Sequence, residues 1–170
     1  MIDGGYASDQ VDEIMGTERV GDELVRDLFI LLESDAPVAD ALARNGVQEL
    51  GWVLEDSLDA IVAAADGLRL YCLRDAPVDA RGLALKVALG GVLHKTIACT
   101  QSRDVRRGWL TLGRLEDEGE AVAATLRMRL SRDGSPMAGH WSDIVELLEQ
   151  ALHGCQHAAA IRVAAGLQPA

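Results

Sequence analysis

The sequence predicts an all-α protein, a single domain folded as a bundle of four or five helices. Apolar residues recur every three or four positions over long stretches, as they do on one face of an amphipathic helix. Alanine and leucine dominate the apolar residues, and aromatic residues make up 4% of the chain. Such a composition suits closely packed helices better than a β-sandwich, and no stretch alternates with the period of a strand.

The same periodicity divides the chain into segments. Residues 1–15 are polar and contain glycine, so we expect a loose N-terminal tail followed by a helical bundle domain over residues 16–166. Pro37 and Pro77 end apolar stretches, because proline cannot continue a helix. The first expected helix begins near Thr17, and the second and third cover residues 38–73 and 79–103. A fourth helix follows Gly108. After a loop over residues 131–141, a fifth helix begins with Ser142 as its N-terminal cap.

The third expected helix differs from the others in carrying two apolar stripes. Leu83, Val87 and Gly90 belong to one stripe, and Leu85 and Leu89 belong to a second on nearly the opposite side. A helix that is apolar on two sides is usually central in its bundle. We therefore expect this helix to occupy the middle of the fold.

Net charge and cysteine content restrict the class of protein. The formal net charge of −11 disfavours binding to nucleic acid, because the phosphate backbone repels an acidic surface. Cys72, Cys99 and Cys155 are widely spaced and odd in number, which argues against a disulfide framework and for small core residues. We expect neither a secretory signal nor a membrane-spanning segment, and a cytoplasmic location.

The C-terminal third contains a candidate metal site. Glu149, His153 and His157 are spaced by four residues, so a helix places them on one side, where two histidines four residues apart can share a divalent ion. At about 100° per residue, this side lies opposite the apolar stripe around Leu148 and Leu152. A solvated face or a dimer seam is the simpler interpretation of the same pattern.

A second candidate site surrounds His94 in the third helix. Gly90 and Gly91 precede this histidine by one turn, and adjacent glycines leave space for a ligand or for another backbone. His94 could therefore line a small ligand pocket. The simpler alternative is a core histidine that is hydrogen-bonded to a neighbouring helix. Phosphotransfer is a third interpretation, and it requires an exposed imidazole.

No catalytic residue, cofactor or nucleotide-binding loop is predicted from the sequence. We expect a non-enzymatic binding or adaptor protein that contacts a protein partner or itself through helix faces. Val25, Phe29 and Ile30 give the first helix more apolar surface than one stripe requires, which favours a homodimer. The alternative is a helical bundle that binds a small molecule or a metal through His94, or through Glu149, His153 and His157.

Overall fold

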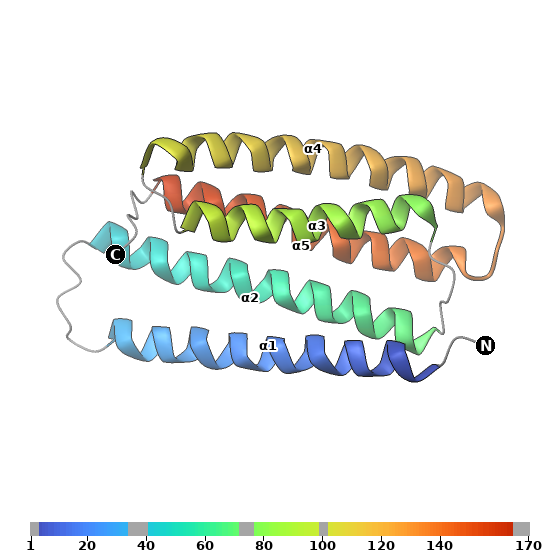
Figure 1. Cartoon of the computed structure of the whole chain (residues 1–170), viewed down its shortest axis with the longest axis horizontal. Helices are drawn as coiled ribbons and strands as arrows, with labels where there is room; N and C mark the ends of the chain where they lie inside the picture. The colour runs from blue at the N-terminus through green and yellow to red at the C-terminus, as the bar shows by residue number, and fades with distance from the viewer. Residues whose placement is uncertain (1–3, 34–40, 72–76, 99–101, 165–170) are drawn as a thin grey trace.

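The computed structural model describes residues 4–33, 41–71, 77–98 and 102–164, and it confirms the predicted all-α bundle. Within these ranges every regular element is a helix (Figure 1). None of these helices combines the length and the hydropathy that a membrane-spanning helix needs. The five helices are α1 (Gly4–Glu33), α2 (Ala41–Leu70), α3 (Val78–Ala98), α4 (Ser102–Asp133) and α5 (Ala138–Ala164).

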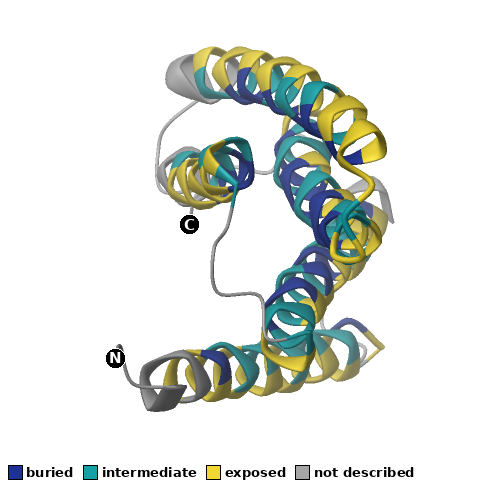
Figure 2. Cartoon of the chain, turned by 90° about the vertical axis from the view of Figure 1, so that its right-hand side faces the viewer, coloured by how far each residue is buried: buried dark blue, intermediate teal, exposed yellow. Residues whose placement is uncertain are grey.

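Helix α5 is the centre of the arrangement. It packs against α2, α3 and α4, whereas α1 packs only against α2 among the described helices. Viewed along the helices, α4, α5, α2 and α1 follow one another in an open curve, and α3 lies inside that curve beside α4 and α5 (Figure 2). The bundle is therefore open on the side where α3 and α1 lie apart.

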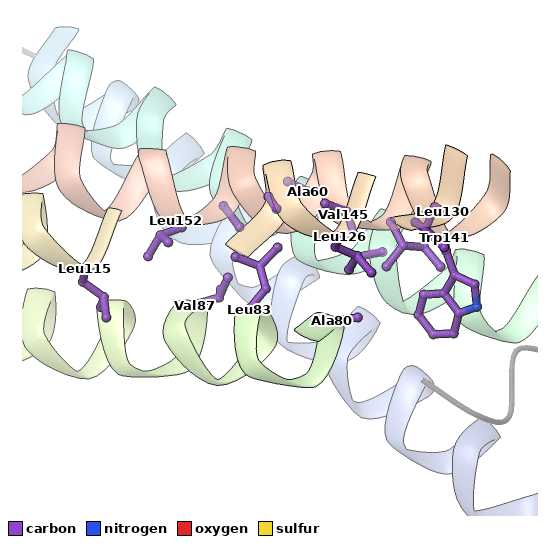
Figure 3. Close-up of a cluster of buried hydrophobic side chains, with 14 residues drawn as sticks. Ala60, Ala80, Leu83, Val87, Leu115, Leu126, Leu130, Trp141, Val145 and Leu152 are labelled. Atoms are coloured by element: carbon purple, nitrogen blue, oxygen red, sulfur yellow. The ribbon is translucent and has the colours of Figure 1, made fainter. Parts of the chain in front are cut away.

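The main core forms where α3, α4 and α5 meet. Leu83 of α3 and Val145 of α5 are fully buried, and Leu126 of α4 is nearly so. Figure 3 shows these side chains pointing toward one another, with Trp141 closing one end of the cluster. A fully buried Leu or Val side chain contributes about 1.5 to 3 kcal/mol, so the side chains of this junction stabilise the fold.

Helices α2 and α5 approach closely at a glycine. A Cβ atom built on Gly154 would collide with the Ser57 side chain of α2. The Ser57 hydroxyl is itself buried and donates a hydrogen bond to the Val53 carbonyl at 2.6 Å. A side chain at position 154 would therefore push the two helices apart.

The connection between α4 and α5 is shorter than the predicted loop over residues 131–141. Gly134 has a φ of 59°, the left-handed conformation in which glycine commonly ends a helix. The Ser135 carbonyl then accepts a hydrogen bond from the Ala138 amide at 3.0 Å, and the Ser135 hydroxyl accepts one from the Met137 amide at 3.2 Å. Ser135, rather than Ser142, therefore organises the start of α5.

The expected loose tail is helical from Gly4 onward. Val11 is buried, and together with Ile14 it extends the apolar periodicity of the first helix by more than one turn. The polar residues between these positions concealed that continuation in the sequence. The expectation of a tail over residues 1–15 is wrong for residues 4–15.

The prediction that the third helix is central is also wrong. Helix α3 contacts α4 and α5 through the stripe that contains Leu83 and Val87, while Leu85 and Leu89 of the second stripe are exposed. The central position belongs to α5, whose buried residues extend around more than half of its circumference. Hydropathy identifies an apolar stripe, but it does not specify whether another helix covers that stripe.

Several sequence expectations concern residues outside the described ranges. They are the end of an apolar stretch at Pro37, the core positions of Cys72 and Cys99, and the end of the bundle domain near residue 166.

Candidate functional site

Helix α3 has an exposed apolar face on the side away from the core. We call Val78, Leu85, Leu89 and Val92 the α3 outer face; these residues are exposed by 76%, 70%, 47% and 61%. Their separations of seven, four and three residues are those of a coiled-coil seam. Four large aliphatic side chains in one line are more than scattered surface residues, and they mark a candidate contact surface.

Helix α1 carries a second exposed stripe with similar spacing. We call Val20, Leu24 and Leu31 the α1 outer stripe; these residues are exposed by 56%, 66% and 61%. Residues 20 and 24 are four apart, and residues 24 and 31 are seven apart. Asp27 stands at the intervening seam position and is solvent-exposed, which gives this stripe an acidic centre.

The apolar residues that the sequence assigned to a subunit seam have a different arrangement. Val25 and Phe29 face α2, where both side chains lie within 4 Å of a Cβ built on Gly51. The Phe29 ring also contacts the Trp52 ring edge-on, with centroids 5.7 Å apart. Val25 and Phe29 therefore contribute to the α1–α2 contact, whereas Ile30 is exposed.

An acidic cluster occupies the contact between α1 and α2. Oxygen atoms of Glu18, Asp22 and Asp59 all lie within 4.8 Å of one another. Desolvation, followed by the Asp22 carboxylate, raises the pKa of Glu18. The same two causes, in the same order, raise the pKa of Glu55. Sequence reasoning missed this cluster, because only the spacing of Glu18 and Asp22 is visible within one helix.

The two histidines of the predicted metal site each approach a carboxylate from another helix. Nδ1 of His153 lies 2.5 Å from Oε1 of Glu116 in α4, a distance at which the imidazole donates a hydrogen bond to the carboxylate. Nε2 of His157 lies 3.7 Å from Oε1 of Glu49 in α2. The side chains of His153 and His157 are exposed by 66% and 44%. The imidazoles thus lie at the solvent edges of the grooves that α5 forms with its neighbours.

The third residue of the predicted metal site is engaged elsewhere. Glu149 forms an ion pair with Arg127 of α4, and the rings of His153 and His157 have centroids 6.0 Å apart. Among the described residues, the acidic cluster of Glu18, Asp22 and Asp59 is the group whose ligand atoms converge closely enough to hold one ion. Glu149, His153 and His157 share a side of α5 but do not converge in this way.

A groove between α2 and α5 passes beside both histidines. It has a volume of about 450 Å³, and Asp56, Asp59 and Gln150 line it together with His153 and His157. Ser57 and Gly154 form part of its floor at the closest approach of the two helices. The groove is open and polar at its rim, so it could accept a small ligand without enclosing it.

The space that the sequence predicts beside Gly90 and Gly91 is only partly open. A Cβ built on Gly90 would lie 3.1 Å from Cδ1 of Leu152 and 3.5 Å from Cβ of Cys155, so α5 occupies this side. A Cβ on Gly91 would meet nothing within 4 Å. The glycine pair therefore serves the close approach of α3 and α5 at Gly90.

His94 is half-buried, and its Nε2 atom has no hydrogen-bond partner among the described residues. Burial, followed by the positive charge of Arg162, lowers the pKa of His94. The imidazole is thus neutral at pH 7, in keeping with a core residue. Its buried Nε2 counts against phosphotransfer, which needs an exposed ring nitrogen.

The described part of the chain provides one free cysteine, Cys155. This side chain is mostly buried against α3, and burial raises the pKa of its thiol. A protonated, buried thiol is a poor nucleophile. Cys155 therefore packs as a small apolar residue, as the sequence predicted.

Comparison with known proteins does not assign this chain to a family. No protein-family model matches this chain, and no curated protein sequence matches it significantly. Its function is therefore inferred from the side-chain geometry described above.

Proposed function

We propose that this chain is a non-enzymatic helical binding protein that acts through helix faces, with a second copy of itself as the partner. The α3 outer face is the observation that carries this proposal. Another protein that presents an apolar helix is the alternative partner. The odd number of widely spaced cysteines supports a reducing, cytoplasmic setting.

The hydrophobic effect supplies the driving force. Val78, Leu85 and Leu89 each leave about half or more of the side chain in water. Covering the four residues of the face would contribute on the order of 5 kcal/mol, at 1.5 to 3 kcal/mol for each complete side chain. Association also costs translational and rotational entropy, so more than one such contact is needed for micromolar affinity.

The net charge of the chain opposes self-association. Each copy carries a net charge of −11, so two copies repel one another at long range. Only short-range burial or locally opposite charge can overcome this repulsion. The regular spacing of the α3 outer face supplies the first of these.

Sedimentation velocity of the purified chain from about 1 to 100 µM tests the proposal. We expect a concentration-dependent dimer that Leu85→Asp dissociates, because the charged side chain would be desolvated at the seam. Leu110→Asp is the matched control, since Leu110 of α4 is 53% exposed and lies outside the α3 outer face. A wild-type chain that stays monomeric throughout, or a Leu85→Asp chain that dimerises normally, would overturn the proposal.

A second candidate function is metal or small-molecule binding beside α5. It is favoured by the bond from His153 to Glu116, because metal-binding histidines usually donate their second ring nitrogen to a carboxylate. Elemental analysis of the purified protein tests it. Stoichiometric zinc that is lost in His153→Ala would favour this function, and its absence from protein purified without chelators would count against it.

A further inference from the structure

The proposed self-association requires a surface on the second copy, and the chain offers one whose apolar residues have a matching spacing. Val20 and Leu24 of the α1 outer stripe repeat the four-residue step between Leu85 and Leu89 of the α3 outer face. Both pairs are exposed, and both belong to helices that meet few others. Helix α1 contacts only α2, and helix α3 contacts α4 and α5 but not α1 among the described residues.

The charges of the two helices are opposite in sign. Helix α1 contains eight acidic and two basic residues, a net charge of −6. Helix α3 contains one acidic and three basic residues, a net charge of +2 with histidine neutral. In a chain of net charge −11, α3 is therefore the most basic of the five described helices, followed by α4 with seven basic and six acidic residues.

The local charges beside the seams agree with this difference. Arg81, one turn before Leu85, is exposed on the same side of α3. Asp27 lies between Leu24 and Leu31 on the α1 outer stripe and is also exposed, and its carboxylate lies 3.7 Å from Nε of Arg26 in the same helix. Two charges of α3 are already paired with α4: Asp79 pairs with Arg129, and Lys86 pairs with Glu118. An α1 stripe placed on an α3 face would therefore bring a helix of net charge −6 against a helix of net charge +2.

We infer that the partner of the α3 outer face is the α1 outer stripe of a second copy, in a reciprocal dimer. This pairing rests on the proposed self-association. In it, the α1 outer stripe of each copy packs on the α3 outer face of the other copy. A two-fold axis produces two identical α1–α3 seams, and such closure prevents further growth. The two seams bury both exposed stripes of both copies. An α3–α3 contact, by contrast, would place like charges together and leave α1 exposed.

Complementary substitutions test the pairing. The double variant Leu85→Asp, Leu89→Asp makes the α3 face acidic, and the double variant Val20→Lys, Leu24→Lys makes the α1 stripe basic. In a dimer of either variant alone, the two helices that face each other in each seam would carry charges of the same sign. We therefore expect each variant alone to be monomeric at 100 µM. Mixed in equal amounts they restore one native seam and one seam of opposite charges, so we expect a 1:1 dimer by sedimentation velocity.

Control variants separate this pairing from its alternatives. Ile30→Lys lies roughly 80 to 120° around α1 from Val20 and Leu24, and it should leave the dimer intact. Circular dichroism must show that each double variant keeps its helicity; if one does not, Leu24→Gln and Leu85→Gln replace it, with at least tenfold weaker dimerisation expected for each.

The outcomes distinguish the two levels of the proposal. If the α1 variant dimerises like the wild type while the α3 variant does not, the reciprocal pairing is wrong but the α3 outer face remains the contact surface. The pairing is also wrong if both variants are monomeric and their mixture forms no dimer. A wild-type chain that is itself monomeric overturns both.

Discussion

Leu83 and Leu85 lie two residues apart on α3, yet Leu83 is completely buried and Leu85 is 70% exposed. The first side chain belongs to the junction of α3, α4 and α5, and the second belongs to the α3 outer face. Because the two residues are chemically identical, the difference in their surroundings alone sets what each contributes. One supports the fold, and in our account the other supports association.

Alanine substitution at these two positions should separate the two roles. Leu83→Ala removes buried methyl groups and leaves a cavity, so we expect a loss of about 2 to 5 kcal/mol in the free energy of unfolding. Leu85→Ala should change that free energy by less than about 0.5 kcal/mol in the monomer. Urea denaturation at sub-micromolar concentration measures both. Equal losses at the two positions would mean that Leu85 is part of the core.

The close approach of α2 and α5 gives a second prediction. Gly154→Ala forces a Cβ against the Ser57 hydroxyl, so we expect a loss of about 1 to 3 kcal/mol in the free energy of unfolding. Adding Ser57→Ala removes the atom that is hit and should recover most of the loss. Gly113→Ala in α4 is the control: a Cβ there meets nothing within 4 Å, so the better helix propensity of alanine should add about 1 kcal/mol. A harmless Gly154→Ala would contradict the contact.

The acidic cluster predicts that docking of α1 strengthens as the pH falls. The pKa values of Glu18 and Glu55 are raised in the folded state. The two glutamates therefore stabilise the folded state fully when the pH is below their unfolded pKa near 4.5. This stabilisation is lost as the pH rises through their raised pKa values in the folded state.

Asp22→Asn tests this dependence, because it removes a charge that acts on both glutamates. We expect the melting temperature at pH 7 to rise slightly, on the order of 1 °C, and less at pH 4.5. Glu23→Gln makes the same change of charge at an exposed position of α1 and is the matched control. Equal effects of the two variants at pH 7 would show that only net charge matters.

His94 gives a pH dependence of opposite sign. Burial and then Arg162 lower its pKa below the ordinary value of 6.5, so the folded state binds this proton less readily than the unfolded state. Its contribution to stability is present above pH 6.5 and is lost as the pH falls through the folded value. We expect His94→Gln to lose less stability than the wild type between pH 7.5 and pH 5.5.

Nuclear magnetic resonance can check the same residue directly. The imidazole C2 proton of His94 should titrate below pH 6.5, and this signal can be assigned from its loss in His94→Gln. A titration at or above that value would mean that the ring is solvated in the folded state. The phosphotransfer interpretation would then regain support.

The fold class was predictable because helix periodicity is local. Apolar spacing located all five helices, and the missing strand pattern excluded a sheet. The predicted helix ends were less accurate where the local backbone conformation determines where a helix stops or starts, as it does at Gly134 and Ser135. The start of α1 was missed because Val11 and Ile14 were too few to define a periodic face by themselves.

The assignment of partners to each face was not predictable in the same way. The two stripes of α3 were recognised from the sequence, but whether the second is covered depends on where α1 and α5 lie. The acidic cluster and the pairing of His153 with Glu116 join residues of different helices, and such contacts have no signature within one helix. The side of α5 that carries the histidines was predicted correctly, because it follows from helix geometry alone.

The most direct test of the central claim is the accessibility of the α3 outer face in solution. A single cysteine introduced as Leu89→Cys, in a chain whose three native cysteines are alanine, reports this accessibility through its rate of reaction with a maleimide. We predict rapid labelling at about 1 µM and at least tenfold slower labelling at about 100 µM, where a second copy covers the face. A labelling rate constant that is rapid and unchanged across this range would contradict the account.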